Sequence, residues 1–325
     1  MSLLTTILGR LIKAAITLLT IAVLNFFLIH AAPGDPAAVL AGEAGAADPL
    51  FIAQLRERFG LDQPLCVQLW SYVKNVLTLD LGYSFRQGMP VYDLIASRLP
   101  ATLLLTLSSF IISLSLGIAF GVAAAARVGK ASDSLLTTLA LLFYATPLYW
   151  AALMAVLVFS VQLGWLPGFG YETVGSGYTG LARAWDILQH LILPAMTLGL
   201  FFMAVYMRMT RASMLEVSQM DFVKTARAKG LSGPVIRRRH ILRNALLPVV
   251  TLAGLQAGQL IGGAVLTETV FAWPGIGRLM FESLEARDYN TILGVFLVSA
   301  AMVIVFNILT DIVYRIVDPR IGAKT

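Results

Sequence analysis

The sequence predicts an all-α polytopic membrane protein with about six transmembrane helices. Of the 325 residues, 58% are hydrophobic and only 13% are charged, which leaves too little polar surface to cover a water-soluble globule. In addition, six apolar stretches lack Asp, Glu, Lys and Arg and are long enough to cross a hydrocarbon core, which needs about 20 residues per helix. They are approximately Ala14–Ala32, Ala101–Ala126, Ser134–Leu163, Ile187–Met207, Asn244–Thr267 and Tyr289–Thr310.

The first of these stretches shares features with a secretory signal peptide, because Arg10 and Lys13 precede it and Ala31 and Ala32 end it. The apolar core of a signal peptide is shorter, at about 7 to 15 residues. We therefore expect this segment to be retained as the first transmembrane helix.

The segment from Pro33 to Pro100 is predicted to lie outside the membrane and to form short amphipathic helices. Asp48 and Pro49 have the form of a helix N-cap and a first helical residue. Gly60 is a suitable stop for this helix.

Two further helices are expected in the same outer segment. One begins near Pro64 and ends at the turn Asp80-Leu81-Gly82. The other runs from Pro90 to Leu99 and leads into the second span, which is typical of an interfacial elbow.

Two spans contain an internal proline, which predicts a kink because proline cannot complete the helical hydrogen-bond ladder. These residues are Pro147 in the third span and Pro194 in the fourth. Glycines at four-residue spacing suit close packing of helices in lipid, although they are equally compatible with lipid-facing positions. The pairs are Gly117 with Gly121 and Gly258 with Gly262.

The distribution of charge predicts the orientation, because Lys and Arg in short loops resist translocation. With the N-terminus inside, the predicted inner segments hold most of the 24 Lys and Arg, whereas the outer segments hold most of the 18 Asp and Glu. Both termini are therefore expected in the cytoplasm, as is the long loop 208–243 between spans four and five. This topology explains the net charge of +6 without nucleic-acid binding.

The loop 208–243 is basic, yet its pattern predicts a structured helix. Ser218 and Asp221 have the spacing of a capping box ahead of the helix Phe222–Lys229, and Gly230 is a plausible C-cap. Small residues on this helix would permit close docking of another protein. They are Thr225, Ala226 and Ala228.

Two interpretations of this loop remain open at this point. A short helix held between two spans can transmit movement from a cytoplasmic partner. Alternatively, the loop is an ordinary positive-inside connection in which Arg237, Arg238 and Arg239 bind anionic lipid headgroups.

No catalytic or metal-binding motif is found in the sequence. The nearest feature to a nucleotide phosphate loop is Gly129-Lys130, which is followed by Ala131 rather than Ser or Thr. The three histidines are far apart, and Cys66 is the single cysteine, so no disulfide can form within the chain. We therefore expect no catalytic residue, no metal and no cofactor in this chain.

The loop resembles the cytoplasmic EAA loop of the dipeptide, oligopeptide and nickel permease family of bacterial ABC importers. The matching residues are Asp221-Phe-Val-Lys-Thr-Ala-Arg-Ala-Lys-Gly-Leu-Ser232 and His240-Ile-Leu-Arg-Asn-Ala-Leu-Leu-Pro248. The Glu-Ala-Ala that names the loop is replaced here by Lys224-Thr225-Ala226.

Further blocks along nearly the whole chain agree with the same family. They are Pro33-Gly-Asp-Pro36, Gly60-Leu-Asp-Gln-Pro-Leu65, Asp80-Leu-Gly-Tyr-Ser84, Arg98-Leu-Pro-Ala-Thr102, Glu268-Thr-Val-Phe-Ala-Trp-Pro-Gly-Ile-Gly277, Arg287-Asp-Tyr289 and Asp318-Pro-Arg-Ile321.

The resemblance implies a type I ABC importer permease fold in a multi-pass protein of the bacterial inner membrane. It implies a second homologous permease, two cytoplasmic ATPase subunits that carry ATP and Mg²⁺, and an extracytoplasmic solute-binding protein. The organisation expected is an N-terminal helix with an outer segment (1–95), a transmembrane core (96–316) and a cytoplasmic tail (317–325).

The resemblance also implies which residues couple the permease to the ATPase. They are Asp221, Phe222, Thr225, Ala226, Ala228, Lys229, Gly230 and Leu231. Glu268, near the outer end of the fifth span, is the candidate for the substrate path; simple solvation at a helix end is the alternative.

The expected cargo is a dipeptide or oligopeptide, with glutathione or a nickel chelate as alternatives in the same family. A secondary transporter or channel is a distant alternative, since such proteins normally carry an ionisable residue near the membrane centre. None of the six predicted spans has a charged residue near its centre.

Overall fold

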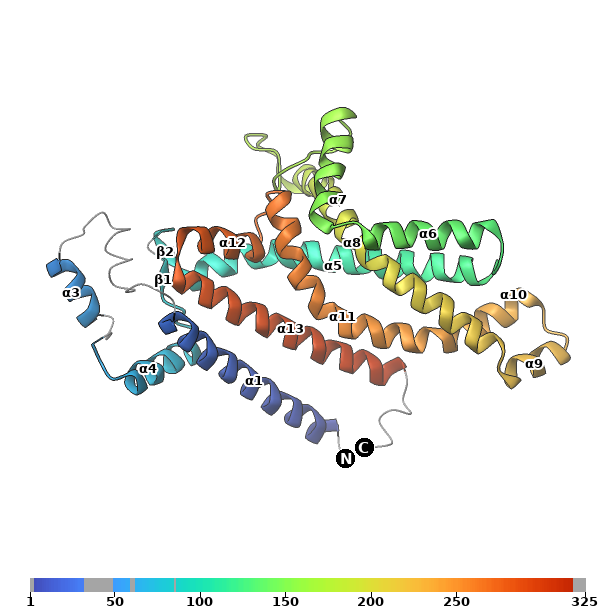
Figure 1. The fold of residues 1–325 in the computed structure, drawn as a ribbon, viewed down its shortest axis with the longest axis horizontal. Helices are drawn as coiled ribbons and strands as arrows, with labels where there is room; N and C mark the ends of the chain where they lie inside the picture. Colours follow the sequence, from blue (N-terminus) through green and yellow to red (C-terminus); the bar gives the residue numbers. More distant parts are fainter. Residues whose placement is uncertain (1–2, 32–48, 59–61, 85, 318–325) are drawn as a thin grey trace. The chain divides into compact units, whose positions relative to one another are not determined.

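The structure is a computed structural model that describes residues 3–31, 49–58, 62–84 and 86–317, and Figure 1 shows its ribbon. It is helical apart from one short hairpin. The elements are α1 (Leu3–Ala31), α3 (Pro49–Arg58), α4 (Leu65–Leu77), β1 (Tyr83–Ser84), β2 (Met89–Pro90), α5 (Val91–Ala125), α6 (Ala131–Ala145), α7 (Leu148–Ala155), η1 (Val156–Gln162), α8 (Gly180–Ser218), α9 (Asp221–Ala228), α10 (Gly233–Val235), η2 (Ile236–Leu242), α11 (Arg243–Val270), α12 (Ile276–Ala286) and α13 (Tyr289–Val317).

The chain divides into two compact units. The first unit comprises residues 1–100 and 275–304, and the second comprises residues 101–274 and 305–325. Both α5 and α13 begin in the first unit and end in the second.

In the first unit, the outer segment is tied to the start of α13. Ser84 on β1 donates a hydrogen bond of 2.5 Å to Oδ2 of Asp288, which lies 204 residues later. The same carboxylate caps α13, because it accepts hydrogen bonds from the backbone N–H and the hydroxyl of Thr291. Asn290 adds a bond of 3.0 Å to the carbonyl of Tyr83. Two sequence blocks that resemble the permease family therefore meet in space.

The second unit is built around α8, which packs against α6, α7 and α11. Its main hydrophobic cluster includes Leu198, Phe202 and Tyr206 of α8 together with Val249 and Ala253 of α11. All five side chains are buried, as the apolar pattern of the fourth and fifth predicted spans requires.

Close contact between α5 and α8 depends on two glycines. A Cβ atom added at Gly117 would lie 2.5 Å from Cβ of Tyr206, and one added at Gly121 would lie 2.5 Å from Cβ of Thr210. Both glycines therefore belong to a helix interface, which decides between the two interpretations left open by the sequence. Gly262 differs, since a Cβ atom there would have no neighbour within 4 Å.

The structure supports a membrane-spanning protein, as expected from composition. Among the described residues, three helices are long and apolar enough to cross a membrane: Val91–Ala125, Gly180–Ser218 and Tyr289–Thr310. A fourth span results if the bent pair Ala131–Ala145 and Leu148–Gln162 counts as one. The first predicted span coincides with α1, whose apolar part Ile12–Leu28 is shorter, and the fifth coincides with α11.

Two expected details of the spans differ in the structure. At Pro147 the third predicted span is not merely kinked but broken, because α6 and α7 meet at 103°. The residue before a proline avoids helical dihedrals, and Thr146 is extended, with φ −78° and ψ 129°. Residues 91–99 form no separate elbow, since they are the first turns of α5, which continues through Pro100.

Two of the three helices expected in the outer segment are present. They are α3 and α4, and α4 ends just before the predicted turn at residues 80–82. The proposed cap Asp48 and the stop Gly60 lie outside the described residues.

Candidate functional site

The loop between α8 and α11 is folded throughout. After α8 ends at Ser218, the short helix α9 runs from Asp221 to Ala228, and α10 and η2 then lead into α11. Residues at the junctions from α10 to η2 and from η2 to α11 keep helical dihedrals, so the chain enters α11 without a turn. A helix in this loop was the main structural prediction from the sequence.

The capping box expected at the start of α9 is absent. The hydroxyl of Ser218 donates a hydrogen bond of 2.7 Å to the carbonyl of Leu215 and thus belongs to the end of α8. Met220 occupies the N-cap position with extended dihedrals and no side-chain bond. Asp221 is the first residue of α9, where its carboxylate is stabilised by the positive end of the helix dipole. It also pairs with Lys224 at 2.8 Å.

The end of α9 has the geometry predicted for Gly230. This residue has a φ of +74°, in the left-handed region that glycine adopts without strain. Its N–H donates to the carbonyl of Arg227, and the N–H of Leu231 donates to the carbonyl of Ala226. These two bonds form a Schellman motif, which stops the helix and reverses the chain.

One face of α9 is anchored to the rest of the second unit. Val223 is completely buried and Ala226 is only 5% exposed. They pack in a cluster with Met214 and Val217 of α8, Ile236 and Ile241 of η2 and Ala245 of α11. Ala226 was expected to permit docking of a partner, but it lies on the buried face of α9 and packs against the rest of the second unit.

The opposite face of α9 is open. Most of the residues predicted to couple the chain to an ATPase are exposed: Asp221, Phe222, Thr225, Ala228, Lys229, Gly230 and Leu231. Phe222 and Leu231 each leave 40% of their surface exposed. The open face therefore carries both apolar and charged side chains.

A nearby ion pair joins α6 to α8. Arg211 Nε lies 2.7 Å from Oδ1 of Asp133, and Nη2 lies 2.8 Å from Oδ2. Asp133 also accepts the N–H of Gly129 in the turn before α6. The sequence located both residues at the predicted inner side but gave no signal that they pair, since they are 78 residues apart.

Glu268 of α11 is fully buried. Its Oε1 accepts a hydrogen bond of 2.6 Å from the hydroxyl of Thr102 on α5. Close by in the sequence, the indole N–H of Trp273 donates to the carbonyl of Ala101 at 2.8 Å. The alternative of simple helix-end solvation for Glu268 is therefore wrong, because the carboxylate contacts another helix rather than solvent.

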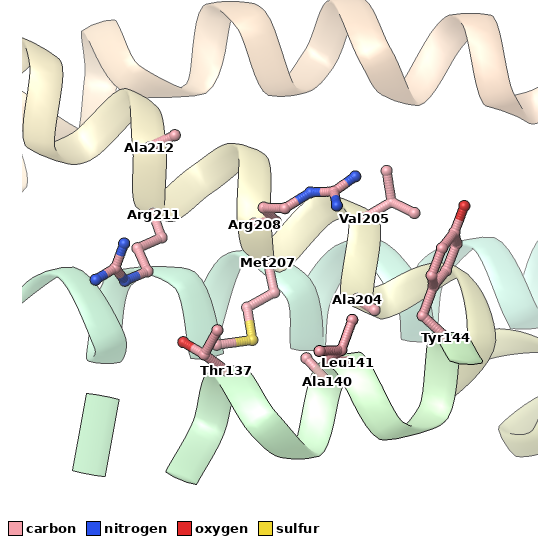
Figure 2. A pocket seen from close by; sticks show the side chains of 10 residues that line it. All are labelled: Thr137, Ala140, Leu141, Tyr144, Ala204, Val205, Met207, Arg208, Arg211 and Ala212. Carbon is pink, nitrogen blue, oxygen red and sulfur yellow. The ribbon is translucent and has the colours of Figure 1, made fainter. Parts of the chain in front are cut away.

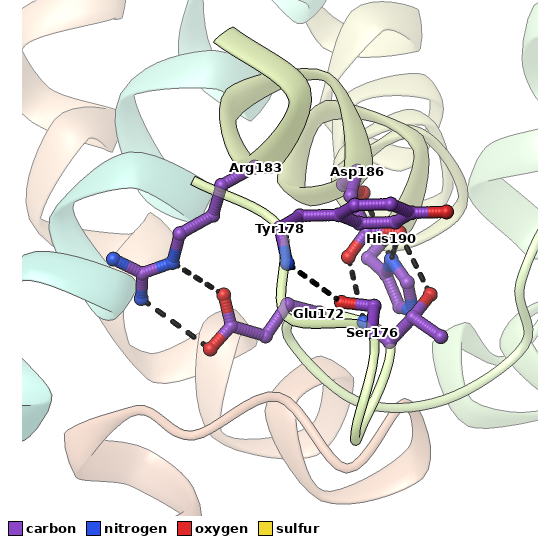
Figure 3. Close-up of polar contacts among 7 residues, drawn as sticks. Glu172, Ser176, Tyr178, Arg183, Asp186 and His190 are labelled. Carbon is purple, nitrogen blue, oxygen red and sulfur yellow. Dashed lines mark hydrogen bonds and ion pairs between the residues drawn. The ribbon is translucent and has the colours of Figure 1, made fainter. Parts of the chain in front are cut away.

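The glycine-rich loop before α8 is organised by a second polar cluster, shown in Figure 3. The carboxylate of Asp186 accepts hydrogen bonds from the backbone N–H of Thr173, at 2.6 Å, and from its hydroxyl, at 2.7 Å. His190, one turn further on α8, lies 2.8 Å from the carbonyl of Asp186. Arg183 pairs with Glu172 at the exposed edge of the cluster. Sequence patterns missed this cluster because the loop has no periodicity.

No group of three or more His, Cys, Asp or Glu residues is placed to hold a metal ion within the described ranges. Cys66 is exposed and free.

The apolar helices and the folded basic loop define a multi-pass helical membrane protein, and comparison with known proteins gives the family. Residues 117–323 match the family described as binding-protein-dependent transport system inner membrane component, and residues 3–106 match the N-terminal family of such components. The chain belongs to this family of binding-protein-dependent inner membrane permeases. It is the permease component of an ABC transporter, a transport subunit rather than an enzyme.

Similar proteins cover almost the whole chain. A dipeptide transport system permease protein of Alkalihalophilus pseudofirmus is 40% identical over 96% of this chain and 97% of its own length. A glutathione transport system permease protein of Salmonella typhimurium is 42% identical, covering 98% and 99%. A putative peptide transport system permease protein of Brucella abortus is 42% identical, covering 97% and 98%.

A solved structure supports the fold. An inward-facing methionine ABC transporter chain superposes with a TM-score of 0.56 at 18% identity, covering 69% of this chain and 96% of that chain. The chain therefore has an ABC transporter permease fold. Family membership also excludes the secondary transporter and the channel, and it implies an ATPase and a solute-binding protein as partners.

Proposed function

We propose that this chain is one of two permease subunits of an ATP-driven importer that carries dipeptides or oligopeptides across the bacterial inner membrane. The observation that carries the proposal is nearly full-length sequence identity of 40% to 42% to permeases named for dipeptide, peptide and glutathione transport. Glutathione is itself a short peptide, so these names share one chemical class of cargo.

The arrangement in the membrane follows from charge and apolar length. In a type I permease with six spans, α1 and α11 cross the membrane in addition to the candidate helices. Because the number of spans is even, both termini lie on the same side, the cytoplasm. The loop that contains α9 is then cytoplasmic, as its lysines and arginines favour. The segment after α1 and the loop before α8 face outwards, towards the solute-binding protein.

The exposed face of α9 is the surface that docks on an ATPase subunit. Movement of the docked subunit reaches the membrane helices because Val223 and Ala226 are packed against side chains of α8, η2 and α11. Closure of the ATPase pair on ATP thus shifts α9 together with the inner ends of these helices. A second permease and a second ATPase complete the assembly.

Substrate transfer requires the spans to change their contacts, and the bond between α5 and α11 at Glu268 supports a part for this residue in that change. Its bond to Thr102 joins α5 to α11 within the second unit. Separation of these two helices in another state would expose a carboxylate able to bind the amino terminus of a peptide. In this proposal Glu268 is a substrate-path residue that is covered in the present state.

Transport by the complete importer in vesicles tests the cargo. The assay supplies the cognate binding protein with a dipeptide, an oligopeptide, glutathione or a nickel chelate, and measures ATP-dependent uptake. Uptake of one or more peptides is expected. Uptake of the nickel chelate alone would overturn the peptide assignment while leaving the family unaffected.

Site-specific cross-linking tests the role of α9 and the topology. In a Cys66→Ser background, Ala228→Cys is expected to cross-link to a cysteine on the ATPase surface, because Ala228 is exposed. Val223→Cys is the matched control on the buried face of the same helix and should not react. Cross-linking from Ser176→Cys, in the loop before α8, in place of Ala228→Cys would invert the proposed topology.

A further inference from the structure

A groove between α6 and α8 lies outside the surface assigned to the ATPase. Figure 2 shows the side chains that line it. The groove has a volume of about 310 Å³, and both of its walls belong to the second unit. Its floor is formed by small or apolar side chains, among them Ala140, Ala204 and Met207, all of which are buried. Leu141 and Tyr144 line its open side and are largely exposed.

The polar end of the groove is basic. Arg208 and Arg211 both line it, one turn apart on α8. The charge of Arg211 is already neutralised by Asp133. Within the part of the chain that the structure describes, Arg208 has no carboxylate partner, and its side chain is exposed. The apolar floor thus lies beside one cation that is available to bind an anion.

The groove lies across the inner end of the predicted fourth span. It follows α8 from Ala204 to Ala212, which corresponds to about 12 Å at the rise of an α-helix. The predicted fourth span ends at Met207, so Arg208 lies at the level of the headgroups while Ala204 and Tyr144 lie at the depth of the acyl chains.

We propose that this groove binds an anionic phospholipid, with its phosphate on Arg208 and one acyl chain along the apolar floor between α6 and α8. A phospholipid supplies both required features, an anion and a narrow apolar chain. An arginine at a membrane surface attracts anionic headgroups, and a site between helices restrains that headgroup further. The lipid would pack against the helix that connects α9 to the membrane core and would hold α6 and α8 together in this state.

Photo-cross-linking of lipids to the complete importer tests the proposal. Vesicles of phosphatidylcholine carry a trace of either phosphatidylglycerol or phosphatidylcholine with a photoreactive acyl chain, and labelled peptides are mapped by mass spectrometry. Residues 137–144 and 204–212 should be labelled about fivefold more by the anionic lipid. Equal labelling by the two lipids, or labelling of neither segment, would overturn the proposal.

Variants separate a specific site from general attraction. Arg208→Gln is expected to reduce labelling by phosphatidylglycerol to the level of phosphatidylcholine. Arg127→Gln, an exposed arginine in the turn before α6, should leave the preference unchanged. Leu141→Trp enlarges an exposed side chain that lines the groove within the predicted third span, and it should reduce labelling by both lipids.

Two further experiments distinguish competing occupants of the groove. Excess inorganic phosphate should leave the labelling unchanged, and competition by phosphate would identify a soluble anion rather than a lipid. A cross-link from Thr137→Cys to the second permease in the assembled importer would show that protein covers the groove, and it would exclude the lipid.

Discussion

Asp133 and Arg211 form a two-point ion pair that joins the start of α6 to α8, with the Asp133 side chain 7% exposed and that of Arg211 31% exposed. Planar two-point pairs are stronger and more specific in geometry than single contacts. Arg211 lines the groove between α6 and α8, and α8 leads into α9, so the pair ties the end of α8 that precedes the loop to α6.

Replacement of Arg211 by Gln is expected to destabilise the second unit, because it leaves a largely buried carboxylate without its cation. The melting temperature of the purified importer should fall by roughly 2–4 °C. Arg183→Gln, which breaks the more exposed pair with Glu172, is the control and should change it by less than about 1 °C. If the double variant Asp133→Asn with Arg211→Gln is destabilised by the full sum of the single changes, the two residues do not act as a pair.

Gly230 is expected to be needed for coupling because its φ of +74° strains any residue with a branched Cβ. An L-residue in this conformation costs about 1–2 kcal/mol. Gly230→Val should therefore loosen the end of α9 and abolish peptide-stimulated ATP hydrolysis while the protein still inserts. Gly230→Asn should retain most activity, since asparagine tolerates left-handed dihedrals.

Gly233→Ala is the matched control for that series, because Gly233 lies in the same loop with free space around it. It should leave ATP hydrolysis unchanged. Equal activity of Gly230→Val and wild type would show that the precise end of α9 is not needed for coupling.

Gly121 is expected to tolerate no larger side chain. An added Cβ atom would lie 2.8 Å from the carbonyl oxygen of Met207, and neither helix backbone can yield easily in a packed bundle. Gly121→Val should cost about 1–3 kcal/mol and reduce the amount of folded protein, measured by size-exclusion profile and thermal unfolding. Gly262→Ala is the control, because a Cβ atom there meets open space, and it should behave like wild type. An equal loss of folded protein in both variants would contradict the interface assigned to Gly121.

Replacement of Glu268 by Gln is expected to change peptide transport but not the stability of the protein. Glu268→Gln keeps an acceptor for the Thr102 hydroxyl, so its melting temperature should stay close to wild type, whereas the KM for peptide uptake should rise severalfold. Glu285→Gln, at an exposed position of α12, is the control for loss of one carboxylate. Unchanged KM in Glu268→Gln would assign the residue to helix packing alone.

Much of the local structure follows from sequence patterns. The apolar stretches, the amphipathic helices of the outer segment and the end of α9 at Gly230 all depend on residues within a few positions of one another. The capping box predicted at Ser218 is wrong, and the cause is also local: its hydroxyl donates to a competing acceptor in the preceding turn of α8.

The sequence by itself determined that this protein is a helical membrane permease with a structured basic loop, because hydrophobic length, charge distribution and motif order are properties of the linear chain. Only the tertiary structure decided that Ala226 lies beneath α9, that Pro147 separates two helices at 103° and that Glu268 is buried against Thr102. The physical reason is that each of these features depends on which distant segments pack together. Burial, bond partners and groove shape are fixed by those contacts, and no local pattern encodes them.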